Sequence, residues 1–218
     1  MVTGGAGGLG RAVTAAFLEH GWRVMVPTER PGDIEERDGL DTCVADLTDP
    51  DQVARAVRRA IGENGAPLRA LVNLVGGFAA GQPVAETPLA DFERQFALNL
   101  RPTYLVTQAA LPHLVGAGGG AIVCTGSRVA LEPVAGQAGY AASKAAVIAF
   151  ARAVAAEHAA DGVRCNAIVP TLIDTPANRA SLPESAWPRM VPPERIARVI
   201  RFLCADESAA INGAALVV

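Results

Sequence analysis

The sequence has 218 residues, half of them hydrophobic and 19% charged, and a formal net charge of −3 at pH 7. A chain of this length fits one domain, and its apolar content excludes a disordered protein. The mild acidity and the lack of any basic run argue against nucleic acid as a partner. No apolar stretch reaches the roughly 18 residues that span a bilayer, and no signal peptide is visible, so we expect a cytoplasmic protein without membrane contact.

The first ten residues form a glycine-rich turn that leads into an amphipathic helix over residues 11–20. Such a turn lets the backbone approach a pyrophosphate closely, and the helix N-terminus supplies free N–H groups and a partial positive charge. The spacing from Thr3 to Gly10 is Thr-Gly-x-x-x-Gly-x-Gly, which differs from the more widespread Gly-x-Gly-x-x-Gly. We therefore expect a pyrophosphate to bind at this turn.

Short apolar strands alternate with helices along the rest of the chain. The pattern predicts strands at 23–26, 42–44, 70–75, 121–124, 164–169 and 214–218, and helices at 11–20, 50–64, 89–115, 139–160 and 193–205. Apolar runs of this kind are typical of parallel strands that are buried on both faces. The alternation predicts a single-domain α/β protein over residues 1–218, a doubly wound parallel sheet with its ligands beyond the carboxyl ends of the strands.

Both chain ends look truncated at the level of their strands. Only two residues precede Thr3, although a strand usually has about 5–6 residues, and the last predicted strand stops at Val218. We expect the first strand to lie in the middle of the sheet, so its shortness should cost stability.

The cysteines and histidines do not suggest a metal site. Cys43, Cys124, Cys165 and Cys204 lie in apolar segments without Cys-x-x-Cys spacing, and the three histidines are not in ligand spacing. We expect buried free thiols, a reducing compartment and no metal ligands.

Tyr140 and Lys144 are the most informative pair in the chain. They are four residues apart at the start of a predicted helix, which places both side chains on one helix face. A phenol titrates near pH ~10, but a neighbouring cation favours the phenolate and lowers that pKa. The pair could therefore serve as a proton donor and acceptor near neutral pH, although the spacing alone also fits an ordinary solvated helix face.

Together the glycine-rich turn and Tyr-x-x-x-Lys resemble the short-chain dehydrogenase/reductase family. Ser127 precedes Tyr140 by thirteen residues, which fits the spacing of that family. Further agreement, over essentially the whole chain, comes from Asp46 after an apolar strand, residues 71–77 in place of the family's Asn-Asn-Ala-Gly, Asn99 within a long helix, and residues 169–175. The resemblance implies a Rossmann-like fold that transfers a hydride between NAD(P)(H) and a small carbonyl or alcohol substrate.

The resemblance also implies roles for four catalytic residues. Tyr140 would be the general acid or base, and Lys144 would lower its pKa and bind the nicotinamide ribose. Ser127 would hold the substrate oxygen. Asn99 would interrupt its helix and hold a water molecule that links Lys144 to solvent.

The cofactor contacts are likewise implied by the resemblance. Gly4, Gly8 and Gly10 would form the pyrophosphate turn, with Leu9 near the nicotinamide. Asp46 and Leu47 would frame the adenine, and Asn73 and Gly76 would line the adenosine ribose side. The nicotinamide end would be held by Tyr140, Lys144, Pro170, Ile173 and Thr175, although the family's Pro-Gly reads Pro-Thr at 170–171 and an ordinary loop is an alternative there.

The choice between NAD and NADP stays open. An acid at the end of the second strand would accept from the ribose 2′-hydroxyl, whereas a base there would receive a 2′-phosphate. Thr28 stands at the usual acid position, and Glu29 and Arg30 follow it.

The segment at about 175–192, rich in proline, has the length of a mobile substrate lid. Trp187 and Met190 would either close over an apolar substrate or simply pack against the surface.

The helices at 89–115 and 139–160 correspond to those that pair between subunits in the family, so we expect a homodimer or a homotetramer.

Two alternatives to an active enzyme follow from the same residues. The chain could be a non-catalytic NAD(P)-binding module, or an inactive fragment of the same fold. Retention of all four catalytic residue types argues against the first. A sugar-nucleotide epimerase or dehydratase would need an added substrate domain, and too few residues follow Ile173 to form one.

Overall fold

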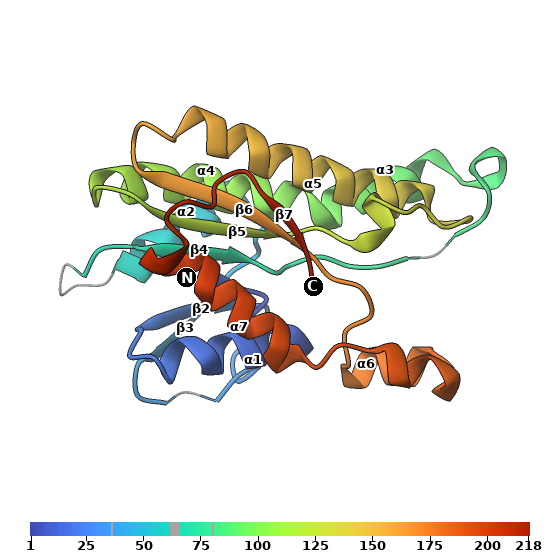
Figure 1. Cartoon of the computed structure of the whole chain (residues 1–218), viewed down its shortest axis with the longest axis horizontal. Helices are drawn as coiled ribbons and strands as arrows, with labels where there is room; N and C mark the ends of the chain where they lie inside the picture. Colours follow the sequence, from blue (N-terminus) through green and yellow to red (C-terminus); the bar gives the residue numbers. More distant parts are fainter. Residues whose placement is uncertain (36, 62–65, 80) are drawn as a thin grey trace.

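Strands and helices alternate along the chain as the sequence predicts (Figure 1). The computed structural model describes residues 1–35, 37–61, 66–79 and 81–218. The strands are β1 (Val2–Thr3), β2 (Val24–Thr28), β3 (Leu40–Val44), β4 (Ala70–Asn73), β5 (Gly120–Thr125), β6 (Val163–Val169) and β7 (Ala215–Val217). The α-helices are α1 (Gly8–Leu18), α2 (Pro50–Ile61), α3 (Leu89–Asn99), α4 (Arg101–Gly116), α5 (Ala138–Glu157), α6 (Pro176–Ser181) and α7 (Pro193–Cys204). Short 3-10 helices are η1 (Val84–Glu86), η2 (Arg128–Ala130), η3 (Glu184–Arg189) and η4 (Asp206–Ser208).

All strand pairs of the two sheets are parallel. One sheet has the strand order β1-β4-β5-β6-β7, and β2 pairs with β3 in a second, two-stranded sheet. Strand β1 has only two residues, Val2 and Thr3, and within the described residues its ladder is formed with β4 alone. Val2 nevertheless shares a core cluster with Val24 and Val26 of β2, so β2 lies beside β1. The doubly wound parallel arrangement is confirmed.

Helices cover both faces of the sheet. In Figure 1, α2, α4 and α5 lie above it and α1 and α7 below it. The core on the upper side includes Val53 of α2, Leu114 of α4 and Val147 of α5. The lower side is filled by α1 and α7, with Phe17 and Ile200 buried there. Because both faces are covered, the carboxyl ends of the strands are where side chains can reach a ligand.

The helical segments depart from their predicted ranges most clearly at three places, of which the first is the interruption expected at Asn99. The helix expected over 89–115 is broken: α3 ends at Asn99, and α4 begins at Arg101. The helix expected over 50–64 ends at Ile61, and its last predicted residues lie outside the described part. The lid segment contains α6 and η3, which the sequence pattern did not indicate.

The N-terminal residue continues the pairing of β1 with β4. The Met1 amine donates to the Ala70 carbonyl oxygen at 2.9 Å, and Val72 N donates to Met1 O at 2.9 Å. At the other end of β1, the Thr3 hydroxyl accepts hydrogen bonds from Leu74 N and Val75 N, so β1 is fixed to the segment that follows β4.

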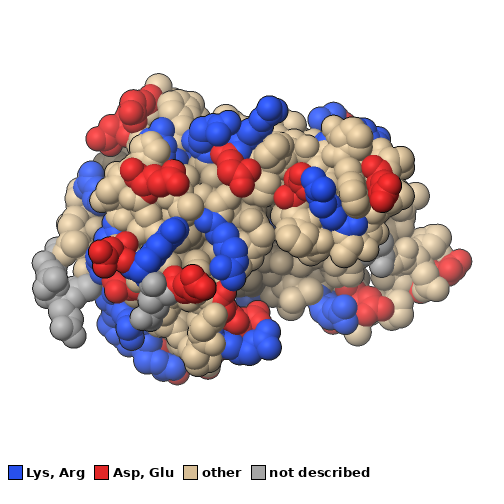
Figure 2. Space-filling view, turned by 90° about the horizontal axis from the view of Figure 1, so that it is seen from below, with Lys and Arg blue, Asp and Glu red and all other residues tan. Residues whose placement is uncertain are grey.

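The surface carries charges of both signs. Figure 2 shows basic and acidic side chains interspersed over the visible face. Among the helices that the structure describes, none combines the length and apolar character that a membrane span requires.

Candidate active site

The glycine turn between β1 and α1 depends on residues without a side chain. Gly4 has φ +66°, a region that favours glycine. A Cβ atom on Gly10 would lie 2.0 Å from the Gly4 carbonyl oxygen, so α1 packs directly on the turn. Helix α1 begins at Gly8 with no side-chain cap, which leaves its first N–H groups available to a phosphate.

A cleft of about 920 Å³ opens beside this turn, at the carboxyl ends of β1 to β4. Among the predicted cofactor residues, it is lined by Gly4, Asp46, Leu47 and Gly76. Thr28, Glu29, Arg30 and Arg11 also line it, so both an acid and bases face the end of β2.

Asp46 has a fixed carboxylate at the cleft wall. Its Oδ1 atom accepts from the Thr48 backbone N–H at 2.8 Å and from the Thr48 hydroxyl at 2.7 Å. These two hydrogen bonds hold the pKa of Asp46 below its usual value. The side chain is therefore a preformed acceptor.

The side chain of Asn73 lies in the core rather than along the cleft. Its Nδ2 atom donates to the Thr107 hydroxyl at 3.0 Å and lies 3.8 Å from Cys124 Sγ. The residue is at the buried end of β4, where strand alternation turns the amide towards α4. Asn73 thus joins β4, α4 and β5.

Asn99 is the residue at which the long helix breaks. Its Nδ2 atom donates to Gln95 O and to Ser143 Oγ, and its Oδ1 atom accepts from Gly77 N at 3.0 Å. The Asn99 carbonyl accepts from the Thr103 hydroxyl at 3.0 Å. The interruption expected at Asn99 is confirmed, and the amide connects α3, α5 and the segment after β4.

Lys144 is buried beside Gly76. Its Nζ atom donates to the Thr125 carbonyl oxygen at 3.0 Å, and a Cβ atom on Gly76 would lie 3.0 Å from Nζ and 2.6 Å from Asn99 Oδ1. Burial lowers the pKa of Lys144 to about 8, against a smaller opposite effect of the Cys124 thiol. Gly76 therefore leaves room for both polar side chains.

Tyr140 lies one helical turn before Lys144, at the start of α5. Its ring meets the edge of the Phe78 ring, with centroids 5.0 Å apart and planes at 88°. The Ser127 hydroxyl hydrogen-bonds the phenol, which lowers the Tyr140 pKa, but burial raises it by more. In this structure burial has the larger effect on the Tyr140 phenol, and the Lys144 ammonium donates to Thr125 O.

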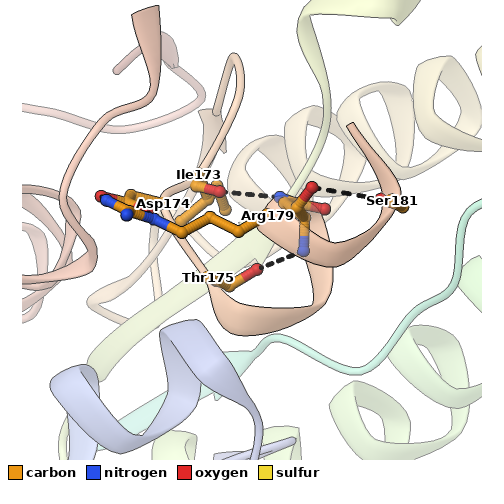
Figure 3. Close-up of polar contacts among 6 residues, drawn as sticks. Ile173, Asp174, Thr175, Arg179 and Ser181 are labelled. Carbon is orange, nitrogen blue, oxygen red and sulfur yellow. Dashed lines mark hydrogen bonds and ion pairs between the residues drawn. The ribbon is translucent and has the colours of Figure 1, made fainter. Parts of the chain in front are cut away.

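The segment after β6 reaches the glycine turn. The methyl group of Thr175 lies so close to Gly8 that a Cβ atom there would be 2.7 Å from it. Thr175 also caps α6, because its hydroxyl accepts from Asn178 N at 3.2 Å, while Asn178 Nδ2 donates to Ile173 O at 2.7 Å (Figure 3). Pro170 O accepts from Arg128 N at 3.0 Å, which joins this segment to the one that carries Ser127.

Two features of the site were missed in the sequence. Phe78 has no recognisable motif, and only the fold shows that it contacts Tyr140. The other could have been found: Lys144 is the only lysine of the chain, and the other 18 of its 19 basic residues are arginines. Arginine stays charged in proteins, whereas a buried lysine can titrate, so a single lysine among arginines indicates a special position.

Residues 1–186 match the family described as short chain dehydrogenase. The chain belongs to the short-chain dehydrogenase family. The resemblance expected from the motifs is thereby confirmed.

Similar proteins span nearly the whole chain. It is 31% identical to 2-(R)-hydroxypropyl-CoM dehydrogenase of Xanthobacter autotrophicus, covering 100% of this chain and 95% of that protein. It is 32% identical to the 3-oxoacyl-(acyl-carrier-protein) reductase FabG of Thermotoga maritima, covering 98% and 92%. A short-chain type dehydrogenase/reductase from Mycobacterium ulcerans has the same fold, with a TM-score of 0.92, 28% identity and coverage of 100% and 86%. The chain is an NAD(P)-dependent oxidoreductase that acts between an alcohol and a carbonyl group.

The position of Gly76 leads to a first prediction. We expect Gly76→Ala to lower kcat/KM by about 10²-fold, because the added methyl displaces Asn99 or Lys144 from its place. The control is Gly116→Ala at the end of α4, where a Cβ atom meets none of the described residues within 4 Å. Steady-state kinetics check both variants, and equal activity of the two would contradict the assigned packing.

The burial of Lys144 leads to a second prediction. The group's pKa falls from 10.5 to about 8 on folding, so the charged form opposes folding below pH 8. Lys144→Met should therefore raise the free energy of unfolding at pH 7, by up to about 3 kcal/mol. The gain should shrink as the pH rises from 8 to 10.5, because the folded wild type then releases its proton and becomes more stable.

Urea unfolding at pH 7 and pH 10 measures this effect. The control is Arg152→Met, which removes an exposed cation from the same helix and should leave stability nearly unchanged. A Lys144→Met protein less stable than wild type at pH 7 would show that the ammonium is not destabilising in the fold.

Proposed function

We propose that Tyr140, Lys144, Ser127 and Asn99 carry the oxidoreduction. The observation that carries the proposal is that the buried Lys144 and the Asn99 amide meet at Gly76, while Tyr140, hydrogen-bonded to Ser127, packs on Phe78 two residues further along the same segment. In carbonyl reduction, Tyr140 gives its proton to the substrate oxygen, which the Ser127 hydroxyl orients. In alcohol oxidation, the same phenol takes the proton back.

Lys144 and Asn99 would serve the proton path. The Lys144 ammonium stabilises negative charge on the Tyr140 oxygen once the proton has left. Its lowered pKa lets it pass a proton on near neutral pH. Asn99 supports a water molecule beside Lys144, through which the proton exchanges with solvent.

The residues present fit a nicotinamide dinucleotide. Cβ atoms on Gly8 and Gly10 would clash with their neighbours and Gly4 has a positive φ, so the turn is built for glycine, as close backbone approach to a pyrophosphate requires. Asp46, Leu47 and Gly76 line the 920 Å³ cleft, where the adenosine half would lie, and Leu9, Pro170, Ile173 and Thr175 would hold the nicotinamide half. The bound cofactor supplies or accepts the hydride.

The substrate would enter under the lid at residues 175–192. Met190 is buried, which supports a packing role for it. Trp187 is half-buried, and its indole nitrogen is buried without a partner among the described residues. The single domain of residues 1–218 thus holds both the cofactor cleft and the lid, and four free thiols support a reducing, cytoplasmic location.

Replacement of the phenol gives the direct test. Tyr140→Phe should reduce kcat by about 10²–10⁴-fold with little change in the cofactor dissociation constant, because only the hydroxyl is lost. Tyr104→Phe is the matched control, since Tyr104 is the other tyrosine and lies exposed on α4. NADH and NADPH are titrated separately, because Glu29 and Arg30 both face the end of β2. Near wild-type kcat for Tyr140→Phe on any carbonyl substrate of a panel would overturn the assignment.

We also propose a homodimer or homotetramer that pairs through α4 and α5. Tyr104 on α4 is 46% exposed and packs against Phe150 on α5, at 5.9 Å between ring centroids. Beside them is an apolar hollow of about 350 Å³, lined by Leu111, Pro112, Val115 and Val154. This face supports burial against a second copy.

Light scattering at micromolar concentration tests the assembly. We expect a mass at least twice that of the chain, and a smaller assembly for Phe150→Glu because the charge cannot be buried at the contact. Phe202→Glu on α7 is the control, since Phe202 is an exposed phenylalanine on the other side of the sheet, whereas Phe150 is partly buried. A monomeric wild type would rule out this proposal.

A further inference from the structure

The two ends of the lid, residues 172–174 and Val191, are hydrogen-bonded to each other and form the neck of the lid. Val191 N donates to Leu172 O at 2.7 Å, and Asp174 N donates to Val191 O at 2.9 Å. Ile173 and Val191 face each other in a parallel bridge. The lid can therefore move only about this neck, because its two chain segments are held to each other.

The first turn of the lid is fixed to that neck. The Thr175 hydroxyl caps α6 by accepting from Asn178 N, and Asn178 Nδ2 donates to Ile173 O; Thr175 and Ile173 are labelled in Figure 3. Ser181 Oγ donates to Asn178 O at 3.3 Å at the other end of the short helix. Helix α6 therefore moves together with residues 173–175.

The Arg179 guanidinium joins Asp174, at the start of the lid, to Trp187 in η3. Arg179 Nε and Nη2 bind the two Asp174 carboxylate oxygens at 2.5 and 2.7 Å. The same guanidinium lies over the Trp187 ring, 4.9 Å from its centroid. An arginine that forks onto a carboxylate and stacks on an indole fixes both groups in direction, which a lysine could not do.

The place of Trp187 depends on this stacking. Its Nε1 atom is buried, and in the described part of the chain it has no hydrogen-bond partner. An indole whose N–H is not anchored is positioned by its packing and by the cation above it. Loss of Arg179 should therefore release η3 together with Trp187.

The lid also rests on the cofactor turn. The Thr175 methyl group meets Gly8, the first residue of α1, at a distance that leaves no space for a Cβ atom. Thr175 follows Asp174 directly in the sequence. A shift of the Asp174 carboxylate is thus passed to the contact between Thr175 and the glycine turn.

We propose that Asp174, Arg179 and Trp187 form a latch of positioning residues that holds the lid against the glycine turn and so sets the cofactor affinity of the enzyme. The inference rests on the proposed function, in which Ile173 and Thr175 hold the nicotinamide end. The latch residues act through Thr175 and do not touch the reacting atoms.

The test compares two isosteric carboxylate variants. Asp174→Asn removes the charge from the latch, whereas Glu132→Gln removes it from the Arg128–Glu132 pair, which has the same forked geometry outside the lid. Arg179→Met and Arg179→Lys extend the series. Direct titrations give the dissociation constants for NADH and NADPH, thermal melts report folding, and Trp187 emission is read in a Trp22→Phe background, since these are the two tryptophans.

We expect the dissociation constant of the preferred cofactor to rise roughly three- to tenfold in Asp174→Asn, Arg179→Met and Arg179→Lys, as the loss of a partly exposed ion pair allows. Trp187 emission should shift to the red, while the melting temperature stays near that of Glu132→Gln. Dissociation constants within twofold of the Glu132→Gln control, with unshifted emission, would overturn the latch. If the wild type binds neither cofactor, the proposed function fails, and an unshifted emission still overturns the latch separately.

Discussion

The burial of one ammonium group is the constraint around which the candidate site is arranged. A charge removed from water needs hydrogen-bond acceptors, and Lys144 has the Thr125 carbonyl at the end of β5. It also needs space, which Gly76 leaves free after β4. Since Asn99 occupies the other side of that space, the break between α3 and α4, the end of β4 and the start of α5 are placed by the same requirement.

The strands transmit this arrangement to the cofactor turn through threonine hydroxyls. Thr125 Oγ1 donates to Asn73 O at 2.8 Å, which fixes the end of β5 to the end of β4. Thr3 Oγ1 then accepts from the two residues after Asn73, so the end of β1 is held at the same level. The glycine turn begins at the next residue. The glycine turn and the proposed proton-transfer residues are thereby built on one set of strand ends, as a parallel sheet permits.

The two titrating groups are shifted in opposite directions by the same cause. Burial raises the pKa of Tyr140 and lowers that of Lys144 to about 8, because in both cases it favours the neutral form. A phenol that keeps its proton at neutral pH is a donor, the form that carbonyl reduction requires. Lys144 is then a group whose protonation changes close to physiological pH, which no arginine in its place could offer.

Much of this could be predicted from the sequence, because it depends on local patterns. Apolar runs gave the parallel strands, and glycine spacing gave the turn before α1. The burial of the Asn73 side chain could not be predicted, since the motif fixes the position of the residue on β4 but not the face of the sheet towards which its amide turns. The contact of Phe78 with Tyr140, the latch within the lid and the raised pKa of Tyr140 depend on burial and on distant segments, which no spacing encodes.

The pKa of Lys144 is the most direct measure of the burial on which the candidate site depends. Because the chain has a single lysine, protein labelled with ¹³C at the lysine ε-carbon gives one side-chain resonance to follow with pH by NMR. We expect a titration midpoint near 8 in the folded protein. A midpoint near the ordinary value of 10.5 would mean that the ammonium is solvated, and it would contradict the buried arrangement on which the site depends.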